Sequence, residues 1–540
     1  MTWSTRTTPP ELAQRYVDAG WWVDEGLGEY LHARLCEMPE FEFRVWSDVR
    51  PWRGTVGDVH EMALRAASGF HALGVRPGDV VSIQIPNWVE AAAVFWGLSI
   101  LGAVPVPIVH FYGAKEVEFI LRESGAVVHV SADHFGHTDF LEQLRAATPN
   151  ATALREIVVV GEDDGGHRPF RALLAHEPLQ GPTHLEPGAP AFVGYTSGTT
   201  ANPKGVVHSQ RSALAEVRIK TVERPWPASD RPNIIGAPVS HATGMLGGLL
   251  SPLVWRFPIH FIDRWDPGAV LHAMAEADLT AGSGGPYFLS SLLDHPDCTP
   301  DHVRRIRHVA IGGSSVPDAL AERATSLGVS IVRGYGSTEH PSTTGAHHEE
   351  PEAKRLHTDG RPHPGVEVRV VDDDGHDVPT GDDGEVLSRG PELFEGYTDP
   401  ELTKAAIDDN GWYATGDVGR LDADGWLTIT DRKKDIIVRG GEKVSAVEVE
   451  QLLYQLPGVA ELAVVAAPDA RLGEHGCVFV RVAPGARTPD LDAVRAHLDA
   501  AGLARQKWPE ELRVVDDFPR TPSGKIKKHV LRDDLRCGAT

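Results

Sequence analysis

The chain has 540 residues, more than one compact hydrophobic core usually organises, so two or more domains are expected. Its 52 basic and 76 acidic residues give a formal net charge of −24, which argues against a surface for nucleic acid or anionic membranes. The four cysteines are scattered without a CxxC pair, which excludes the common zinc spacings and a dense disulfide framework. With no signal-peptide pattern and no apolar run long enough to span a membrane, we predict a cytoplasmic protein.

The first third of the chain alternates short apolar segments with longer amphipathic ones. Helices alternating with short strands indicate βαβ units and a largely parallel sheet. The fold class expected is therefore α/β. The strands are predicted at 80–85, 103–108, 127–131 and 157–160, and the helices at 58–73, 90–101 and 116–124.

A donor-rich loop follows the predicted strand at 191–195. Glycines let backbone N–H groups converge, hydroxyls add donors, and Lys204 adds a positive charge, so the loop could cradle phosphate oxygens. It is not the Walker pattern, because Lys204 precedes Gly205 instead of Ser or Thr. A solvated polar turn has the same composition, and the loop alone leaves both interpretations open. Its candidate residues are Thr196, Ser197, Gly198, Thr199, Thr200 and Lys204.

Two more loops of this kind follow predicted strands at 308–311 and 330–333. In open α/β sheets ligands bind at the carboxyl ends of the strands, where such loops meet. The coincidence of three donor-rich loops is therefore stronger than any one of them. The candidate residues of these two loops are Gly312, Gly313, Ser314, Gly334, Tyr335, Gly336, Thr338 and Glu339.

Beyond residue 366 the pattern changes to short alternating strands around tight turns, which indicates a small antiparallel β unit. Helices and strands resume after the basic stretch at 431–435. We place a domain boundary there, with a large domain at 1–431 and a small α+β domain at 432–540.

Five motifs in order resemble those of the adenylate-forming superfamily, which includes acyl-CoA synthetases, firefly luciferase and nonribosomal adenylation domains. The resemblance covers nearly the whole chain and is closest to acyl-CoA ligases. It implies that the chain binds ATP, Mg²⁺, coenzyme A and a small carboxylic acid, and that its C-terminal domain is mobile. It also leaves open whether the protein forms a homodimer. The motifs are the 196–205 loop, Gly334–Glu339, Tyr413–Asp417, 431–435 with 440–442, and 522–525.

The resemblance also implies a role for each nucleotide-side residue. Glu339 would bind magnesium and Thr338 the α-phosphate, Asp417 the ribose hydroxyls and Arg432 the nucleotide. The glycine loops with Tyr335 would form the adenine slot, and residues 196–204 would hold the departing phosphates. The competing interpretations are an N-capping pair at Thr338–Glu339, tight-turn glycines and an exposed basic run.

Three further residues match the family's catalytic and hinge positions. Lys525 would bridge the carboxylate and the α-phosphate, Lys434 would be the pivot of the C-terminal domain, and His241 would lie near the carboxylate. A solvated tail lysine and a buried core histidine are the alternatives for Lys525 and His241.

Departures from the family pattern bear on the substrate. Ala201 stands where glycine is usual, which favours slower loop closure, and residues 240–245 lack the acid that would bind an amino acid's ammonium group. Ala242 replaces the asparagine of dihydroxybenzoate enzymes, although the N-terminal segment resembles them. The small residues suggest a roomy apolar pocket for a medium-chain, alicyclic or aromatic acid; they are Ala242, Gly244, Gly247, Gly248, Gly284 and Gly285.

We therefore predict an ATP-dependent carboxylic acid–CoA ligase. One alternative is an adenylating enzyme that uses a carrier-protein thiol or another nucleophile, including relatives that activate nitrite. Another is a nucleotide-binding protein without catalysis, against which Lys525, Glu339 and Asp417 together argue.

Overall fold

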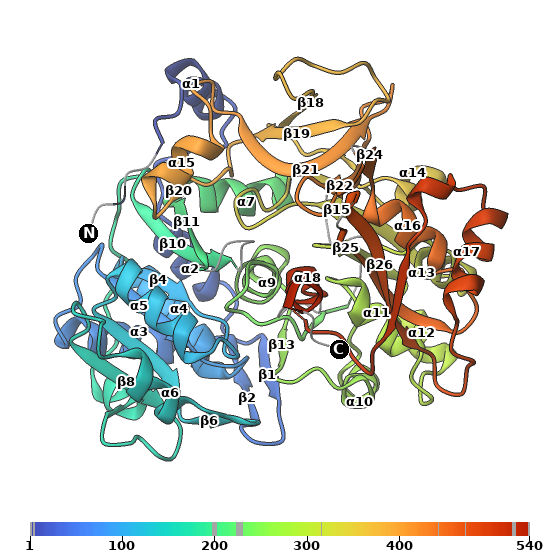
Figure 1. Cartoon of the computed structure of the whole chain (residues 1–540). Coiled ribbons are helices and arrows are strands. Elements are labelled where there is room, and N and C mark those ends of the chain that lie inside the picture. Colours follow the sequence, from blue (N-terminus) through green and yellow to red (C-terminus); the bar gives the residue numbers. More distant parts are fainter. Residues whose placement is uncertain are drawn as a thin grey trace.

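The computed structural model describes residues 3, 6–196, 202–222, 231–314, 316–440, 442–469, 471–520 and 525–537. The predicted phosphate-loop residues Ser197, Gly198, Thr199 and Thr200, and Ala201 with them, lie outside the described residues, as do 522–524 before Lys525. Figure 1 shows a large body made by the first 430 or so residues and a smaller C-terminal lobe beside it. Among the described residues, no helix combines the length and the apolar character needed to cross a membrane.

A parallel sheet forms the first layer of the body, as the alternating pattern predicts. Its strand order is β4-β3-β5-β8-β9, and every residue of β3 and β5 is buried because helices cover the sheet. The strands are β3 (Val80–Gln84), β4 (Val104–Pro107), β5 (Val128–Ala132), β8 (Glu156–Val160) and β9 (Arg168–Pro169). The helices between them are α4 (Val89–Leu101), α5 (Ala114–Ser124) and α6 (Phe140–Ala147).

Helix α4 is buried along its whole length and packs against two other helices, α2 (Leu27–Cys36) and α3 (Val56–Ala72). A glycine lies at each of these helix–helix contacts. A Cβ on Gly28 of α2 would lie 2.1 Å from the Ser99 carbonyl oxygen, and a Cβ on Gly97 would lie 2.5 Å from that of Ala63. The three helices thus pack with backbones in close approach, which fixes α2 and α3 relative to each other.

Two further sheets combine strands from the middle of the chain with two strands near its N-terminus. β1 (Glu42–Trp46) and β2 (Trp52–Thr55) join β12 (Ile234–Ile235) and β13 (Ile259–Ile262), while β14 (His308–Gly312) pairs in parallel with β15 (Ser330–Tyr335). Short strands β16 (Thr344–Gly345) and β17 (Arg361–Pro362) extend the latter sheet. Its flanking helices are α10 (Pro267–Ala277), α11 (Pro286–Leu293), α12 (Pro300–Arg305), α13 (Asp318–Ser326) and α14 (Glu352–His357).

One strand pair differs from the predicted parallel arrangement. β10 (Pro190–Thr196) pairs antiparallel with β11 (Lys204–Ser209), and β11 also pairs with β20 (Gly396–Tyr397). Helix α7 (Gln210–Val222) begins directly after β11. β10 and β11 are therefore the two strands of a β-hairpin. The strand pattern alone could not reveal this direction, because it depends on which strand becomes the partner.

The predicted antiparallel unit is present as β18 (Glu367–Val371), β19 (Gly384–Arg389), β21 (Tyr413–Leu421) and β22 (Leu427–Arg432), with α15 (Pro400–Ala406) inserted before β21. β21 and β22 pair so that Asp417 lies opposite Arg432. Because both residues are functional candidates, this register brings two distant motifs together.

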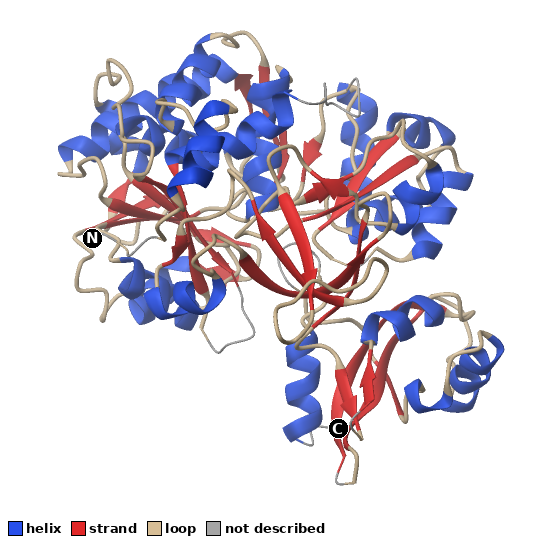
Figure 2. Ribbon diagram, turned by 90° about the horizontal axis from the view of Figure 1, so that it is seen from above, coloured by secondary structure: helices blue, strands red, loops and turns tan. Residues whose placement is uncertain are grey.

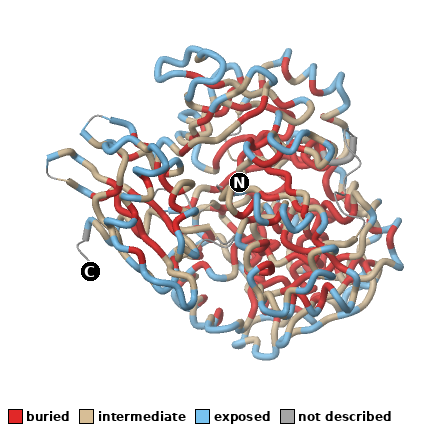
Figure 3. The backbone as a smooth tube through the Cα atoms, turned by 90° about the vertical axis from the view of Figure 1, so that its right-hand side faces the viewer, coloured by how far each residue is buried: buried red, intermediate tan, exposed pale blue. Residues whose placement is uncertain are grey.

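After Arg432 the chain enters a different sheet and a separate core. Figure 2 shows this C-terminal lobe as a small sheet with helices, apart from the larger body, and Figure 3 shows that it has buried backbone of its own. Its apolar core includes Ile437, Val464 and Leu498. The strands are β23 (Ile437–Arg439), β24 (Glu442–Val444), β25 (Val459–Asp469), β26 (Gly473–Val482) and β27 (Glu511–Val514), and the helices are α16 (Ala446–Leu453), α17 (Leu491–Ala500) and α18 (Lys528–Cys537).

Candidate active site

A cavity of about 2370 Å³ runs through the body to the C-terminal lobe. Its lining includes the ends of all three donor-rich loops and, from the lobe, Lys434 and Lys525. The structure thus brings together residues that are more than 300 positions apart in the chain, such as Thr196 and Lys525.

The hairpin β10–β11 holds the two described ends of the first loop. Thr196 and Lys204 are directly paired in the strand register, so the loop between them starts and ends at one place on the cavity wall. The Lys204 ammonium lies 5.2 Å from the centre of the Tyr397 ring. The described part of the loop thus provides a fixed positive charge at its base.

The second and third loops leave adjacent parallel strands. Since β14 and β15 run in parallel, their carboxyl ends lie at one edge, where Gly312 is paired with Gly334. A Cβ on Gly312 would lie 2.6 Å from the Gly334 carbonyl oxygen, and Gly313 has a φ of +79° that favours glycine. Ser314 continues the cavity wall. These glycines therefore permit the close approach that forms the slot.

The third loop is held against its own continuation and against β21. A Cβ on Gly336 would lie 2.0 Å from the Pro341 carbonyl oxygen, so only glycine fits there. The Tyr335 hydroxyl donates to Asp417 Oδ2 at 2.7 Å. Burial and the Asp417 carboxylate raise the pKa of Tyr335 well above its usual value, which keeps this hydroxyl a donor.

Thr338 and Glu339 lie in a non-helical turn, so the alternative of a helix N-cap is wrong. His208 Nε2 donates to the Thr338 carbonyl oxygen at 2.7 Å, and burial lowers the pKa of His208 to about 4, so its ring is neutral. A Cβ on Gly194 would lie 3.0 Å from Thr338 Cγ2. The turn that carries Thr338 and Glu339 is therefore held against the sheet formed by β10 and β11.

Glu339 is 9% exposed and is oriented by a tyrosine. The Tyr397 hydroxyl donates to its Oε1 at 2.8 Å, and the Phe394 N–H donates to its carbonyl oxygen at 2.9 Å. Burial and the Glu339 carboxylate raise the pKa of Tyr397, so the tyrosine stays protonated. Lys204 of the hairpin contacts the same tyrosine through its ring.

Asp417 and Arg432 form an ion pair on neighbouring strands. Arg432 Nε lies 2.6 Å from Asp417 Oδ1, and the Asp417 side chain is only 4% exposed while that of Arg432 is 38% exposed. With Tyr335 on its other oxygen, the carboxylate is held in one orientation at the cavity wall. The predicted basic run is thus only partly a solvated surface, because Arg432 is paired inside the site.

Lys525 extends from the C-terminal lobe to the slot of the large body. Its Nζ lies 3.5 Å from the Gly313 carbonyl oxygen. Burial and the positive charge of Arg432 lower the pKa of Lys525 to about 7. Lys525 is partly buried and lines the cavity, which disagrees with the alternative of a freely solvated tail lysine.

Two further predicted residues surround Lys525. Burial and Arg432 lower the pKa of Lys434 to about 8, and burial and Lys525 lower the pKa of His241 to about 4. Lys434 lies in the turn between β22 and β23, where the chain passes into the lobe. Lysine and arginine side chains close enough to depress one another's pKa values are typical of a site that receives an anion.

The acid side of the cavity is built by a helix with an irregular turn. α8 (Ala242–Met245), the π-helical η2 (Leu246–Leu250) and α9 (Ser251–Trp255) are consecutive, and His241 caps their start by accepting from the Thr243 N–H at 3.4 Å. π-helical turns are rare and concentrate at functional sites. The residues of this segment that line the cavity include Ala242, Leu246, Gly247 and Trp255.

The small residues of the pocket behave in two ways. Gly284 and Gly285 line the cavity, and Gly284 exchanges hydrogen bonds with β14 through the Ala310 carbonyl and the Gly312 N–H, both at 2.9 Å. Gly244 does not line it. A Cβ on Gly244 would lie 2.1 Å from the Pro238 carbonyl oxygen, so this glycine permits backbone packing and adds no room for substrate.

Sequence reasoning missed Tyr397, His208 and the π-helical turn. Tyr397 and His208 act through long-range contacts with Glu339 and Thr338, and nothing in their local sequence signals this. The glycine pair Gly247-Gly248 was the available sign of an irregular helix.

The fold and the cavity define a two-lobed nucleotide-dependent enzyme, and comparison with known proteins identifies its family. The model of the AMP-binding enzyme family matches residues 39–398, and that of the AMP-binding enzyme C-terminal domain matches 448–525. The chain is 32% identical to the medium-chain fatty-acid–CoA ligase of Escherichia coli strain K12 over 98% of this chain and 94% of that protein. It is also 32% identical to a salicylyl-CoA synthase / salicylate adenylyltransferase of a Streptomyces species over 98% of this chain and 97% of that protein.

A solved structure shares the fold. The crystal structure of ATP-bound MatB from Rhodopseudomonas palustris is similar with a TM-score of 0.84 and 26% identity, over 95% of this chain and 100% of that one. The chain therefore belongs to the AMP-binding enzyme family. Its activity is that of an AMP-forming acid–CoA ligase, as the sequence predicted.

Proposed function

We propose that this acid–CoA ligase activates a monocarboxylic acid with a bulky apolar body, of medium-chain, alicyclic or aromatic structure. Leu246, Gly247, Trp255 and Phe257 line the acid side of the cavity with apolar surface. The stretch 240–245 carries no carboxylate to pair with an ammonium group, which disfavours amino acids. Apolar walls with few polar groups suit an acid whose body is buried by the hydrophobic effect.

The two lobes would divide the nucleotide between them. The slot of Gly312, Gly313 and Gly336 would receive the adenine with Tyr335, and Asp417 would accept the ribose hydroxyls. Asp417 is now paired with Arg432 and Tyr335, so it would exchange part of these contacts for the ribose. Lys204 and Thr196, with the loop between them, would hold the β- and γ-phosphates, and Thr338 would donate to the α-phosphate.

Glu339 fits the role of a magnesium ligand. Mg²⁺ binds one or two carboxylates and completes its shell with water and phosphate oxygens. Tyr397 orients Oε1, while among the described residues Oε2 has no hydrogen-bond donor in the protein. When bound there, the ion would neutralise phosphate charge.

The single observation that carries the catalytic proposal is the position of Lys525. Its ammonium reaches Gly313 in the nucleotide slot and lies close enough to His241 to lower that pKa. A carboxylate oxygen held between His241 and Lys525 would attack the α-phosphorus, and the bond to the β-phosphate oxygen would break. The positive charge of Lys525 would stabilise the negative charge on the α-phosphate oxygens in the transition state.

The second half-reaction would follow after the lobe pivots at Lys434. The sulfur of coenzyme A, losing its proton, attacks the acyl carbon, a thioester bond forms, and AMP leaves. Polar contacts between the lobes are suited to such motion, because they exchange readily for water. One is the Gln451 side chain, which donates to the Val316 carbonyl oxygen at 3.1 Å and accepts from the Asp318 N–H at 3.1 Å.

An acid screen tests this proposal. The enzyme is incubated with MgATP and acids of each class, first alone to measure acid-dependent pyrophosphate release, then with coenzyme A to measure the acyl-CoA product. We expect release with bulky apolar acids and none with amino acids. Adenylate without any thioester would favour a carrier-protein thiol or another nucleophile, and activation of only small or charged acids would contradict the substrate class.

A further inference from the structure

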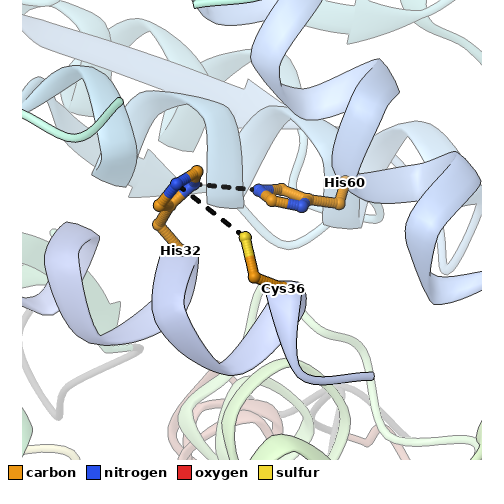
Figure 4. Close-up of side chains that lie close together, drawn as sticks. All are labelled: His32, Cys36 and His60. Atoms are coloured by element: carbon orange, nitrogen blue, oxygen red, sulfur yellow. Dashed lines mark hydrogen bonds between the residues drawn. The ribbon is translucent and has the colours of Figure 1, made fainter. Parts of the chain in front are cut away.

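Two histidines and a cysteine meet between helices α2 and α3, away from the proposed acid and ATP site. His32 and Cys36 are one turn apart on α2, and His60 faces them from α3 (Figure 4). His32 Nδ1 lies 3.1 Å from His60 Nε2, and His32 Nε2 lies 3.9 Å from Cys36 Sγ. One ligand atom from each residue can be chosen so that all three lie within 4.8 Å of one another.

These separations are close to those of a tetrahedral zinc site. Zinc bonds to nitrogen of about 2.0–2.1 Å and to sulfur of about 2.3 Å require donor atoms roughly 3.3–3.6 Å apart. The His32 ring now directs one nitrogen to each neighbour, Nδ1 to His60 and Nε2 to Cys36. Binding would require the side chains to turn until one nitrogen of His32, one of His60 and the Cys36 sulfur surround a single point.

Glycine contacts hold this backbone in place. Gly28 lies one turn before His32 and packs on the Ser99 carbonyl of α4, and Gly97 of α4 packs on the Ala63 carbonyl three residues after His60. Both helices are thus seated on the same buried helix. Donors carried by helices fixed in this way lose little conformational freedom when an ion binds.

The chemistry of the three donors selects a borderline transition metal. Imidazole and thiolate together favour Zn²⁺ over Mg²⁺ or Ca²⁺, which prefer oxygen. His60 is 8% exposed, and its only side-chain hydrogen bond among the described residues is to His32.

The adjacent carboxylates are engaged elsewhere. Glu37 Oε1 pairs with Arg34 at 2.9 Å and its Oε2 with Arg256 at 3.4 Å, while Glu61 pairs with Arg65 at 2.9 Å. Cys36 is exposed to solvent at the end of α2. A water molecule can therefore occupy the fourth position, the arrangement of a three-ligand zinc site.

We propose that His32, Cys36 and His60 form a Zn²⁺ site that cross-links α2 to α3. The Cys36 thiol releases its proton to solvent when its sulfur bonds to the ion, and the metal is not consumed. Because the native fold assembles the three donors, bound zinc stabilises that fold. The site is separate from the magnesium position proposed at Glu339.

Cobalt titration tests the site directly. Tag-free full-length enzyme is stripped with a chelator, exchanged into nucleotide-free buffer and titrated with Co²⁺. We expect one equivalent to bind with a near-ultraviolet thiolate-to-cobalt band and visible bands of four-coordinate intensity, and Zn²⁺ to remove them. Cys36→Ser should abolish the charge-transfer band and weaken binding by about tenfold or more, whereas Cys298→Ser, the matched control, should titrate as the wild type does.

Two further measurements keep the result interpretable if a variant is unstable. Zn²⁺ should raise the unfolding temperature of the wild type but not that of Cys36→Ser. Because Cys36 is exposed, the substitution should not disturb the fold, and the loss of the zinc effect would report on the site itself. Zn²⁺ should also slow alkylation of Cys36, measured by peptide mass analysis, without slowing that of Cys298. The absence of a thiolate band at one equivalent, or equal cobalt affinity in wild type and Cys36→Ser, would overturn the proposal.

Discussion

The two halves of the active-site cavity are built on different principles. In the large body, register pairs and glycine contacts fix the loops: Gly312 against Gly334, Gly336 against Pro341, and Thr196 opposite Lys204. In the C-terminal lobe, Lys525 lies next to a β-bridge between Arg520 and Ile526, and its Nζ approaches the Gly313 carbonyl oxygen at 3.5 Å. Backbone contacts fix the cavity wall of the large body, whereas the lysine that we propose for the chemistry is carried by the C-terminal lobe.

This difference suits a two-step reaction. In the proposed mechanism the nucleotide slot would keep one shape throughout, whereas a lysine used only for adenylation would leave before coenzyme A approaches. Positions held by backbone contacts cannot move without breaking a sheet, but a lobe linked by a turn can pivot at low cost. The predictions below test this division, beginning with the largest effect.

Replacing Lys525 with alanine should reduce acid-dependent pyrophosphate exchange by about 10²–10³-fold, because one positive contact to the transition state is lost. ATP should still bind, as measured by calorimetry, because the body would hold most of the nucleotide, and its affinity should fall only by the part that depends on the charge of Lys525. Lys507→Ala is the matched control, because it removes a lysine of the same lobe that pairs with Glu448 at the surface. Normal exchange by Lys525→Ala would refute the catalytic role.

Replacing Lys434 with proline should slow thioester formation by about 10²-fold or more while adenylation is retained, because the pivot would be locked. Proline should act through conformation alone, because it removes no backbone hydrogen bond: among the described residues, the Lys434 N–H donates none. The neighbouring N–H groups of Lys433 and Asp435 donate to the Gly416 and Arg432 carbonyl oxygens. Single-turnover assays of each half-reaction provide the measurement, with Lys434→Ala to separate charge from rigidity. Equal loss of both half-reactions would argue against a hinge.

Replacing Tyr397 with phenylalanine should raise the half-saturating Mg²⁺ concentration by about tenfold, because Glu339 loses the hydroxyl that orients it. The ring that faces Lys204 is kept, so phosphate contacts from the hairpin should persist. Activity is measured against Mg²⁺ at saturating ATP. Glu339→Gln, which removes the carboxylate, serves as the reference for complete loss of this Mg²⁺ contact. An unchanged Mg²⁺ dependence in Tyr397→Phe would contradict the proposed role of Glu339 as a metal ligand.

ATP binding at pH 8 should take up about one proton. The pKa of Lys525 is about 7 in the free enzyme, and phosphate oxygens should raise it, so the lysine is mostly neutral before binding and mostly charged after it. ATP affinity should consequently fall as pH rises above 7. Calorimetry in buffers of different ionisation enthalpy measures the uptake, and Lys525→Met should lose it; equal uptake in both proteins would assign the proton elsewhere.

Local sequence was sufficient for most strands and helices of the first sheet. Buried β-branched runs such as 80–84 and fully apolar helices such as 89–101 leave few alternatives, and the glycine after α4 ends it in the left-handed conformation at Gly102. The loop residues were also visible, because donor-rich turns after strands have a recognisable composition. The hairpin at β10–β11 was not, since strand direction depends on which strand becomes the partner.

The contacts between distant motifs could not be read in advance. Asp417 and Arg432 were separate candidates until the β21–β22 register made them an ion pair. Gly244 looked like pocket space, but its neighbour Pro238 occupies the place that a side chain would take. Whether a small residue opens a cavity or permits packing is decided by what faces it.

By itself, the sequence determined the α/β class, the order of the motifs and the residue types that acid activation requires, because periodicity and composition are local properties of the chain. Tertiary structure alone decided the partners: Tyr397 on Glu339, Lys525 at Gly313, and His60 opposite His32 and Cys36. Cysteine spacing excluded the common zinc motifs, yet a helix pair brings one cysteine and two histidines together. Sites of this kind depend on packing between helices, and packing is a property of the folded chain.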